Sequence, residues 1–471
     1  MSDYIGILDI GSGFFKGAVF YIDEHIYDEN SELAGEFITQ IKKPSKGIER
    51  GNIVRASAAK NALREVLKLL TDSSNSDFKE LYALITHPKT KFTNVKVELD
   101  LKEQELSAPD EEGLVQVEEK HLQLLKDLVK NQATEAGYEI IHIIPRYFIL
   151  DGEKNYEPVG LHAAKIEGYY HVIKLKKQVF LNIKNLFRAL GYEPKRIMFP
   201  AFVASYDIFN EEDIKKRVLI LDLGHTTTGF SYFTEGSPQI SGALDIGLRD
   251  IAEAFALSYN IPLKTVQRLF EEVGYYKRPT FNSNESKDEV IEVELEDGEM
   301  VTLSKTEIGT VLREAISQIL IDILNRLSEE GVDIINELDE IVLVGGGSNI
   351  PNIKDLIEEV LQGDLNCKIR IGKKRDLSFY GQEESTDELY LSGDFAPIRG
   401  AVNLIKQLKA KGLINVNGSS NPFALQPDKN EQNFEEADTM IISSFEEQTE
   451  GKKQNIFSRL VRFFKNLFSE E

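Results

Sequence analysis

The sequence has little cysteine and little positive charge. Its 471 residues include one cysteine, Cys367, and 55 lysines and arginines against 78 aspartates and glutamates, a formal net charge of −23. A single cysteine excludes an intramolecular disulfide and a cysteine-based metal site, and it fits a reducing cytoplasm. So large a negative charge repels nucleic acid unless a basic patch is segregated, which argues against a nucleic-acid-binding protein.

Long apolar runs are absent as well. No stretch is long enough to cross a bilayer. The first residues open into a strand-like run, 4–8, in place of the basic region and apolar core of a signal peptide. We therefore expect neither secretion nor a membrane span, while attachment to a membrane surface stays open. With 41% hydrophobic and 28% charged residues, the chain has the composition of a globular protein of two to four domains.

The most informative pattern is a pair of similar segments that lie far apart. In each, an apolar run ends in aspartate, one apolar residue and glycine: Asp9-Ile10-Gly11 and Asp222-Leu223-Gly224. Both predict a buried strand that turns sharply at glycine. We interpret them as the starts of two halves of a duplicated architecture. A third predicted strand, 340–344, runs into Gly345-Gly346-Gly347 and precedes a helix.

These three turns have the chemistry of a nucleotide site. Glycine lets backbone N–H groups approach phosphates closely, and an aspartate at the strand end can hold a Mg²⁺ that the phosphates share. Lys16 adds a positive charge to the first turn, and the triple glycine would let a purine ring lie against the backbone. Each motif alone is usually an ordinary turn, so the prediction depends on all three occurring together. The P-loop motif is absent, which excludes that class of nucleotide-binding protein.

Two phosphate loops followed by an adenosine loop resemble the actin-like ATPase superfamily, which includes sugar kinases, chaperone ATPases and bacterial filament proteins. Within it, the chain is similar to the FtsA family of bacterial cell-division proteins. Segments 46–53, 143–151 and 342–351 and the C-terminal tail carry this resemblance. It implies an α/β, duplicated actin-like (ribonuclease H-like) fold with an inserted α+β subdomain, called 1C, a disordered linker and a C-terminal amphipathic helix.

The resemblance also implies domain boundaries. They are 1–79, 166–217 and 393–412 for subdomain 1A, 80–165 for the 1C insertion, 218–247 and 337–392 for 2A, 248–336 for 2B, 413–452 for an acidic flexible linker, and 453–470 for a membrane-targeting helix. Segments 199–205 and 396–400 would be the two hinge connections between the halves.

The site residues are likewise implied by the resemblance. Those expected to bind ATP are Asp9, Gly11, Ser12, Gly13, Lys16, Asp222, Gly224, Thr226, Gly345, Gly346, Gly347 and Ser348. Asp9 and Asp222 would hold Mg²⁺ and are candidate catalytic residues. His225 is the one candidate general base, although a solvent-facing loop histidine is the more ordinary interpretation. Because His225, Thr226 and Thr228 stand where the superfamily often has glycines and an acid, we expect ATP binding with slow or undetectable hydrolysis.

The tail predicts a helix that binds a membrane surface. Segment 418–451 has eight acidic residues and one basic residue, the composition of a disordered tether. At ~100° per residue, the apolar residues of 456–468 fall within about 160° of arc. They are Ile456, Phe457, Leu460, Val461, Phe463, Phe464, Leu467 and Phe468, and the other face carries Arg459, Arg462 and Lys465. Such a face enters the headgroup boundary while the cations meet anionic lipid. Docking on the protein's own core fits less well behind a long tether.

The function implied is that of an ATP-binding, actin-like protein that polymerises on the cytoplasmic face of the cell membrane. It would tether the ring of the tubulin-like FtsZ to the membrane at the division site. Implied partners are the FtsZ C-terminal peptide, further copies of the chain, anionic membrane lipid and other division proteins. Lys305, Arg313 and Arg326, on or next to a predicted helix over 308–327, are candidate contacts for the peptide in 2B. That these are ordinary exposed helix charges is an equally good interpretation.

Two other functions stay open. A small-molecule kinase of this superfamily needs an acid that deprotonates the acceptor hydroxyl; Asp245 is a possible base, although closing a turn is its simpler role. A pilus-assembly adaptor similar to PilM would bind a short cytoplasmic peptide of a membrane partner and needs no lipid helix. A chaperone ATPase is discounted, because no peptide-binding domain follows the nucleotide core. The amphipathic tail favours the membrane adaptor over all of these.

Overall fold

The structure is a computed structural model of the chain. It describes residues 4–27, 33–74, 78, 80–104, 109–210, 212–276, 289–295, 297–361, 367–373 and 391–410. The predicted linker and membrane-targeting helix begin after residue 410 and therefore lie outside the described residues. Within the described ranges, no helix combines the length and the apolar character that crossing a membrane requires.

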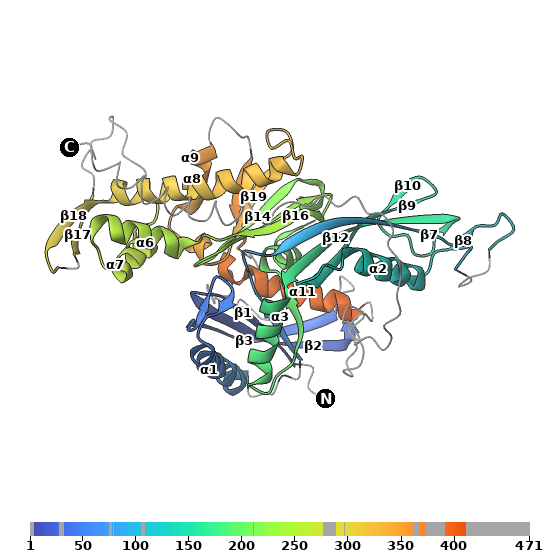
Figure 1. Cartoon of the computed structure of the whole chain (residues 1–471), viewed down its shortest axis with the longest axis horizontal. Coiled ribbons are helices and arrows are strands. Elements are labelled where there is room, and N and C mark those ends of the chain that lie inside the picture. The colour runs from blue at the N-terminus through green and yellow to red at the C-terminus, as the bar shows by residue number, and fades with distance from the viewer. Residues whose placement is uncertain are drawn as a thin grey trace.

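Two five-stranded sheets form the two halves of the molecule (Figure 1). The first contains β1 (Tyr4–Ile10), β2 (Phe14–Tyr27), β3 (Leu33–Pro44), β6 (Glu80–Leu84) and β13 (Pro194–Met198), in the order β3-β2-β1-β6-β13. The second contains β14 (Val218–Leu223), β15 (Thr228–Thr234), β16 (Ser237–Leu244), β19 (Glu340–Val344) and β20 (Lys368–Ile371), in the order β16-β15-β14-β19-β20.

The two sheets have the same topology. In each, the first three strands are antiparallel neighbours, and the fourth and fifth extend the sheet in parallel from the first strand. Numbered by their order within each half, both sheets run 3-2-1-4-5. The first strands, β1 and β14, each lie in the middle of their sheet. All but the first residue of β1 and all residues of β14 are buried, as expected for strands that are covered on both faces. The duplication predicted from the two Asp-x-Gly segments is confirmed.

Helices cover the sheets and join the halves. Flanking the first sheet are α1 (Ala56–Ser74) and α3 (Lys177–Arg188); associated with the second are α6 (Leu248–Tyr259), α7 (Leu263–Glu272), α8 (Lys305–Glu329) and α9 (Ile353–Leu361). Between the halves lie α4 (Pro200–Val203), α5 (Ser205–Ile208) and α11 (Ala396–Ala410), which share one buried core. At the predicted hinges, α11 and α4 touch so closely that a Cβ on Gly400 would lie 2.0 Å from the Val203 carbonyl oxygen.

The inserted subdomain projects from the first half (Figure 1). Its four-stranded sheet has the order β10-β9-β12-β7 and packs α2 against one face. Its elements are β7 (Lys91–Asp100), β8 (Val115–Gln116), α2 (Glu119–Ala133), β9 (Tyr138–Leu150), β10 (Glu153–Asn155), β11 (His162–Ala163) and β12 (Lys165–Lys176). The predicted insertion, 80–165, includes β6 and omits most of β12. By strand pairing, β6 belongs to the first sheet and β12 to the sheet of the insertion.

Several short elements complete the described fold. They are the hairpin β4 (Ile48–Glu49) and β5 (Asn52–Ile53), the hairpin β17 (Val290–Glu294) and β18 (Met300–Ser304), and the 3-10 turns η1 (Asp213–Lys215), η2 (Gly346–Asn349) and η4 (Gly393–Phe395). Of these turns, η2 contacts β14 and β19, and η4 contacts β19 and η2; the β4–β5 hairpin precedes α1.

Candidate nucleotide-binding site

The two motif aspartates face a common site between the halves. Asp9 lies near the end of β1 and Asp222 near the end of β14, and both are more than nine-tenths buried. Thr86, which follows β6 of the first half, donates its hydroxyl hydrogen to Asp222 Oδ2 at 3.1 Å. Its hydrogen bond therefore joins the halves at the predicted Mg²⁺ site, and sequence reasoning did not single this residue out.

Lys16 is buried between two carboxylates, one in its own sheet and one in the segment before α11. Its Nζ lies 2.7 Å from Asp9 Oδ2 and 2.8 Å from Asp394 Oδ1. Lys42 Nζ approaches the other Asp394 oxygen, at 2.7 Å. Burial acts to lower the pKa of Lys16, but the carboxylates of Asp394 and Asp9 outweigh it and raise that pKa. Burial also acts to raise the pKa of Asp394, but Lys16 and Lys42 hold it below its usual range. Neither Asp394 nor Lys42 was predicted, because no local motif marks them.

The net negative charge of this cluster suits a divalent cation. Asp9, Asp222 and Asp394 with Lys16 and Lys42 give three negative charges against two positive ones. Burial, and then the Asp9 carboxylate, raise the pKa of Asp222 to about 6, against the opposing effect of Lys16. Within the described ranges, no group of three or more acids, histidines and cysteines is placed to hold a metal ion alone. Mg²⁺ commonly binds through one or two carboxylates with phosphates and water completing its shell, so the two aspartates suffice.

The first and second loops touch across the site. A Cβ on Gly13 would lie 2.8 Å from the His225 ring, so the glycine is required for this approach. Gly11 is equally restricted, since its Cβ would lie 2.6 Å from the Phe14 carbonyl oxygen. His225 is half-buried between the loops, contrary to the solvent-facing interpretation. Burial, then the nearby Arg249, lower the pKa of His225, which favours the neutral form of its imidazole and makes it a weaker base.

The triple glycine lies against the second loop. Gly345 has φ +78°, and a Cβ there would lie 2.2 Å from Asp222 Oδ1. A Cβ on Gly347 would collide with Leu223 at 2.6 Å. Ser348 Oγ donates to the Gly345 carbonyl at 2.7 Å and closes the turn. The structure thus brings all three predicted loops to one place; Ser12 is half-buried in the first, and Gly224 and Thr226 stand in the second.

Two family models match this chain. One, described as cell division protein FtsA, matches residues 219–393, and the other, the SHS2 domain inserted in FtsA, matches residues 90–174. The chain belongs to the FtsA family. Among curated relatives, the FtsA of Borreliella burgdorferi is 23% identical over 72% of this chain and 78% of its own length. The FtsA of Buchnera aphidicola subsp. Baizongia pistaciae is 23% identical over 76% of this chain and 82% of its own length.

This chain has an actin-like fold with an inserted SHS2 domain, and this confirms the predicted fold class. Among solved structures, a PilM–PilN type IV pilus biogenesis complex superposes with a TM-score of 0.56 at 13% identity. The match covers 85% of this chain and 98% of that one. At this identity the likeness shows the fold alone.

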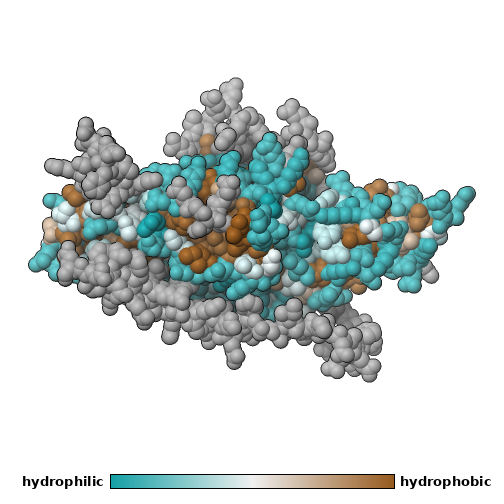
Figure 2. Space-filling model, turned by 90° about the horizontal axis from the view of Figure 1, so that it is seen from above, coloured by the Kyte–Doolittle hydropathy of each residue, from teal (hydrophilic) through white to brown (hydrophobic). Residues whose placement is uncertain are grey.

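The predicted FtsZ contacts of this FtsA-family chain are not brought together. Arg313 and Arg326 lie about 12 Å and about 32 Å from Lys305 along α8, at ~1.5 Å per residue. Lys305 pairs with Glu289, and Arg313 pairs with Glu314 at 2.8 Å. Arg326 donates to the Ala243 carbonyl at 3.2 Å, so it binds the sheet. Figure 2 shows the face on which α8 lies, with apolar atoms gathered near its middle, and Ile321 of α8 is 49% exposed.

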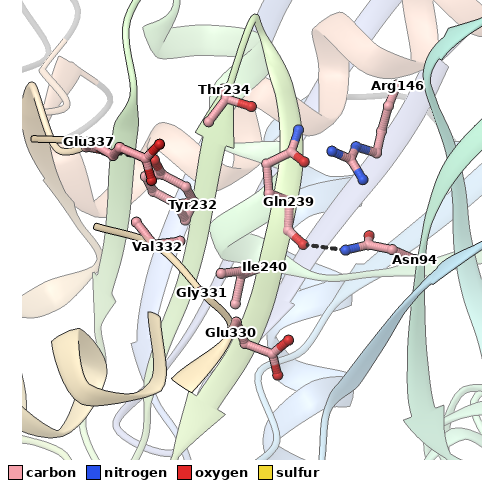
Figure 3. Close-up of a pocket in the computed structure, with 10 residues that line it drawn as sticks. All are labelled: Asn94, Arg146, Tyr232, Thr234, Gln239, Ile240, Glu330, Gly331, Val332 and Glu337. Carbon is pink, nitrogen blue, oxygen red and sulfur yellow. Dashed lines mark hydrogen bonds between the residues drawn. The ribbon is translucent and has the colours of Figure 1, made fainter. Parts of the chain in front are cut away.

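A separate cavity of about 250 Å³ lies where the SHS2-type insertion meets the second sheet. Figure 3 shows Arg146 and Asn94 of the insertion facing Gln239 of β16, and Asn94 Nδ2 donates to the Gln239 carbonyl at 2.9 Å. Behind this contact, His171 bonds to Asn94 Oδ1 at 2.7 Å and to Ser241 Oγ at 2.9 Å. None of the predicted ATP-binding residues lines the cavity. This polar contact therefore joins the insertion to the second half independently of the nucleotide site.

Proposed function

We propose that this FtsA-family chain binds Mg²⁺ and ATP between its two halves and polymerises in that state. The observation that carries the proposal is the convergence of Asp9, Lys16 and Asp222 with three glycine loops at one buried site. Bound Mg²⁺ would supply positive charge that the phosphates and the two aspartates share. Lys16 would bind phosphate as a point charge, and the loops would donate backbone N–H groups.

Hydrolysis in this proposal is slow. His225 is the one predicted base. Its lowered pKa makes it a weaker base, and because it lies against Gly13 it could accept a proton only if the attacking water reached the space between the loops. The kinase alternative loses support, because Asp245 Oδ1 accepts a hydrogen bond from Arg50 at 3.0 Å and is engaged in holding the halves together. An engaged carboxylate is a poor candidate for the base that a kinase needs.

The proposal extends to the membrane through the tail. The amphipathic segment 456–468 would bind anionic lipid on the cytoplasmic face of the membrane, and the FtsZ peptide would bind near α8. One short helix binds lipid reversibly, so joining several tails in a polymer would raise the avidity without any new contact. ATP-dependent assembly and membrane attachment would then reinforce each other at the division site.

Liposome co-sedimentation tests this function. The full chain, a chain ending at Gly451 and the full chain with Asp222→Asn are pelleted with anionic vesicles, each with Mg²⁺·ATP and without it. We expect the full chain to pellet, more so with ATP, and the truncated chain to stay in solution. Asp222→Asn should keep the basal binding and lose the ATP-dependent increase. As a matched control, Asp127→Asn removes an exposed acid of α2 and should behave as the unaltered chain. Equal pelleting of the full and truncated chains would overturn the membrane role of the tail.

A further inference from the structure

The β4–β5 hairpin of the first half reaches into the second half. Arg50 stands at its turn with φ +49°, between Gly47 at +78° and Gly51 at +71°. A non-glycine residue rarely adopts this left-handed conformation unless its surroundings hold it there. A Cβ on Gly51 would lie 2.4 Å from the Thr86 carbonyl oxygen, so the hairpin packs directly on the residue that bonds Asp222.

Arg50 donates hydrogen bonds across the site to the second half. Its backbone N donates to Thr226 Oγ1 at 3.0 Å, and its Nη1 donates to the Thr226 carbonyl at 3.2 Å. Nη1 also donates to the carbonyl and the carboxylate of Asp245, at 2.8 Å and 3.0 Å. Nη2 pairs with Asp250 Oδ1. One residue of the first half thus contacts the predicted second phosphate loop and both acids behind it.

The second phosphate loop is held from its other side by α6. Asp250 Oδ2 accepts from the Gly247 N–H at 2.8 Å and so caps the start of α6. The next two N–H groups of the chain, of Leu248 and Arg249, donate to the carbonyls of Gly224 and His225 at 3.1 Å and 2.7 Å. A Cβ on Gly247 would lie 2.6 Å from Thr226 N. The loop over 224–227 is therefore fixed between the Arg50 guanidinium and the α6 N-terminus, with Asp250 bonded to both.

We propose that Arg50 is a positioning residue that latches the two halves together and holds the second phosphate loop in its phosphate-binding shape. Nucleotide release then requires the Arg50 bonds to Thr226, Asp245 and Asp250 to break. This inference deepens the proposed ATP binding and rests on it for the nucleotide readout. The shape of the loop itself can be measured without nucleotide.

An ordinary ion pair would contribute to stability and leave the loop unchanged. Arg217 is a suitable comparison, because it also pairs with an aspartate through two nitrogens, at 2.9 Å and 2.6 Å from Asp339. That pair lies at the strand starts, away from the loops. Arg50→Lys keeps the charge but loses the planar fork that reaches two carboxylates and two carbonyls at once. It should therefore fall between the unaltered chain and Arg50→Ala.

The test measures dissociation of a fluorescent ATP analogue with Mg²⁺ from the full chain, together with hydrogen exchange over 222–228 in the nucleotide-free protein. We expect Arg50→Ala to speed dissociation by about tenfold, since several charge-assisted bonds are lost. Exchange over 222–228 should rise in the same variant. Arg217→Ala should change neither. Asp250→Asn should add little to the change in dissociation once Arg50 is alanine, because the bond between the two is then already lost and the asparagine oxygen can still accept from the Gly247 N–H.

The outcomes separate this inference from the function on which it rests. If the unaltered chain binds no nucleotide, the proposed function fails, and hydrogen exchange alone decides the latch. Exchange over 222–228 that is equal in Arg50→Ala and the unaltered chain overturns the latch in either case. Nucleotide dissociation that is unchanged in Arg50→Ala, while the unaltered chain binds well, also overturns it.

Discussion

The Lys16 ammonium lies 2.8 Å from the Asp394 carboxylate, although 378 positions separate the two residues. Lys16 follows the predicted first phosphate loop, and Asp394 lies in η4, directly before α11. The lysine expected to bind phosphate is therefore already paired with a carboxylate that directly precedes the predicted hinge, 396–400. Phosphate binding would compete with this pair, which connects the state of the site to the segment between the halves.

Asp394→Asn should lower the stability of the nucleotide-free protein and increase the stabilisation by Mg²⁺·ATP. Loss of a buried carboxylate leaves Lys16 and Lys42 less compensated, a cost of about 3–5 kcal/mol. The site also loses the excess negative charge that opposes an anionic nucleotide. Thermal unfolding with and without Mg²⁺·ATP measures both effects.

Asp213→Asn is the matched control for this change. Asp213 is buried and also pairs with two cations, Lys216 at 2.7 Å and Arg370 at 3.0 Å, but it lies outside the nucleotide site. It should lower stability in the same way and leave the shift caused by Mg²⁺·ATP unchanged. Equal ligand-induced shifts in the two variants would contradict a role of Asp394 at the site.

The raised pKa of Asp222 predicts that the nucleotide-free protein becomes less stable as pH rises from 3.8 to about 6. In the unfolded chain this carboxyl has the ordinary aspartate pKa of 3.8, so between the two values the folded protein binds more protons than the unfolded chain. At neutral pH, this difference in pKa lowers the free energy of unfolding by about 3 kcal/mol. Asp222→Asn should therefore stabilise the nucleotide-free protein at neutral pH, and its advantage should shrink as pH falls below about 6. Thermal unfolding of both proteins across this pH range tests the prediction. A difference in stability between Asp222→Asn and the unaltered chain that does not vary with pH would count against the raised pKa.

The stability of the polar contact between the insertion and the second sheet should depend on His171 and not on Arg146. His171 is buried and bonded at both ring nitrogens, and burial lowers its pKa to about 3. Arg146 is partly buried and its Nε has no hydrogen-bond partner among the described residues. We expect His171→Ala to cost about 2–4 kcal/mol in urea unfolding and Arg146→Met to cost less than about 1 kcal/mol. A larger loss of stability in Arg146→Met than in His171→Ala would show that the charge of Arg146 stabilises this contact.

Gly13→Ala should weaken nucleotide binding without unfolding the protein. The added methyl group would lie 2.8 Å from the His225 ring, so the two loops must separate. His225→Gly in the same chain removes the ring and should restore part of the affinity. A fluorescent ATP analogue measures binding, and circular dichroism monitors folding. Failure of the second change to restore any affinity would mean that Gly13 acts through something other than His225.

The sequence predicted what short patterns encode. The repeated Asp-x-Gly turns predicted the duplicated halves, because a buried strand followed by glycine is a local signal. In the sequence, the β4–β5 turn shows only a family resemblance, and no local pattern indicates that Arg50 contacts Asp245, 195 positions away. Lys42 reads as an ordinary strand lysine until Asp394, 352 positions later, is folded beside it. His225 reads as an exposed loop residue because its burial comes from the other half.

Calorimetric titration of the full chain with ATP in the presence of Mg²⁺ tests the central claim most directly. The account predicts one nucleotide bound per chain, and binding that is strongly weakened by Asp9→Asn or Asp222→Asn but not by Asp127→Asn. Absence of binding by the unaltered chain, or equal binding by all four proteins, would contradict a nucleotide site between the two halves.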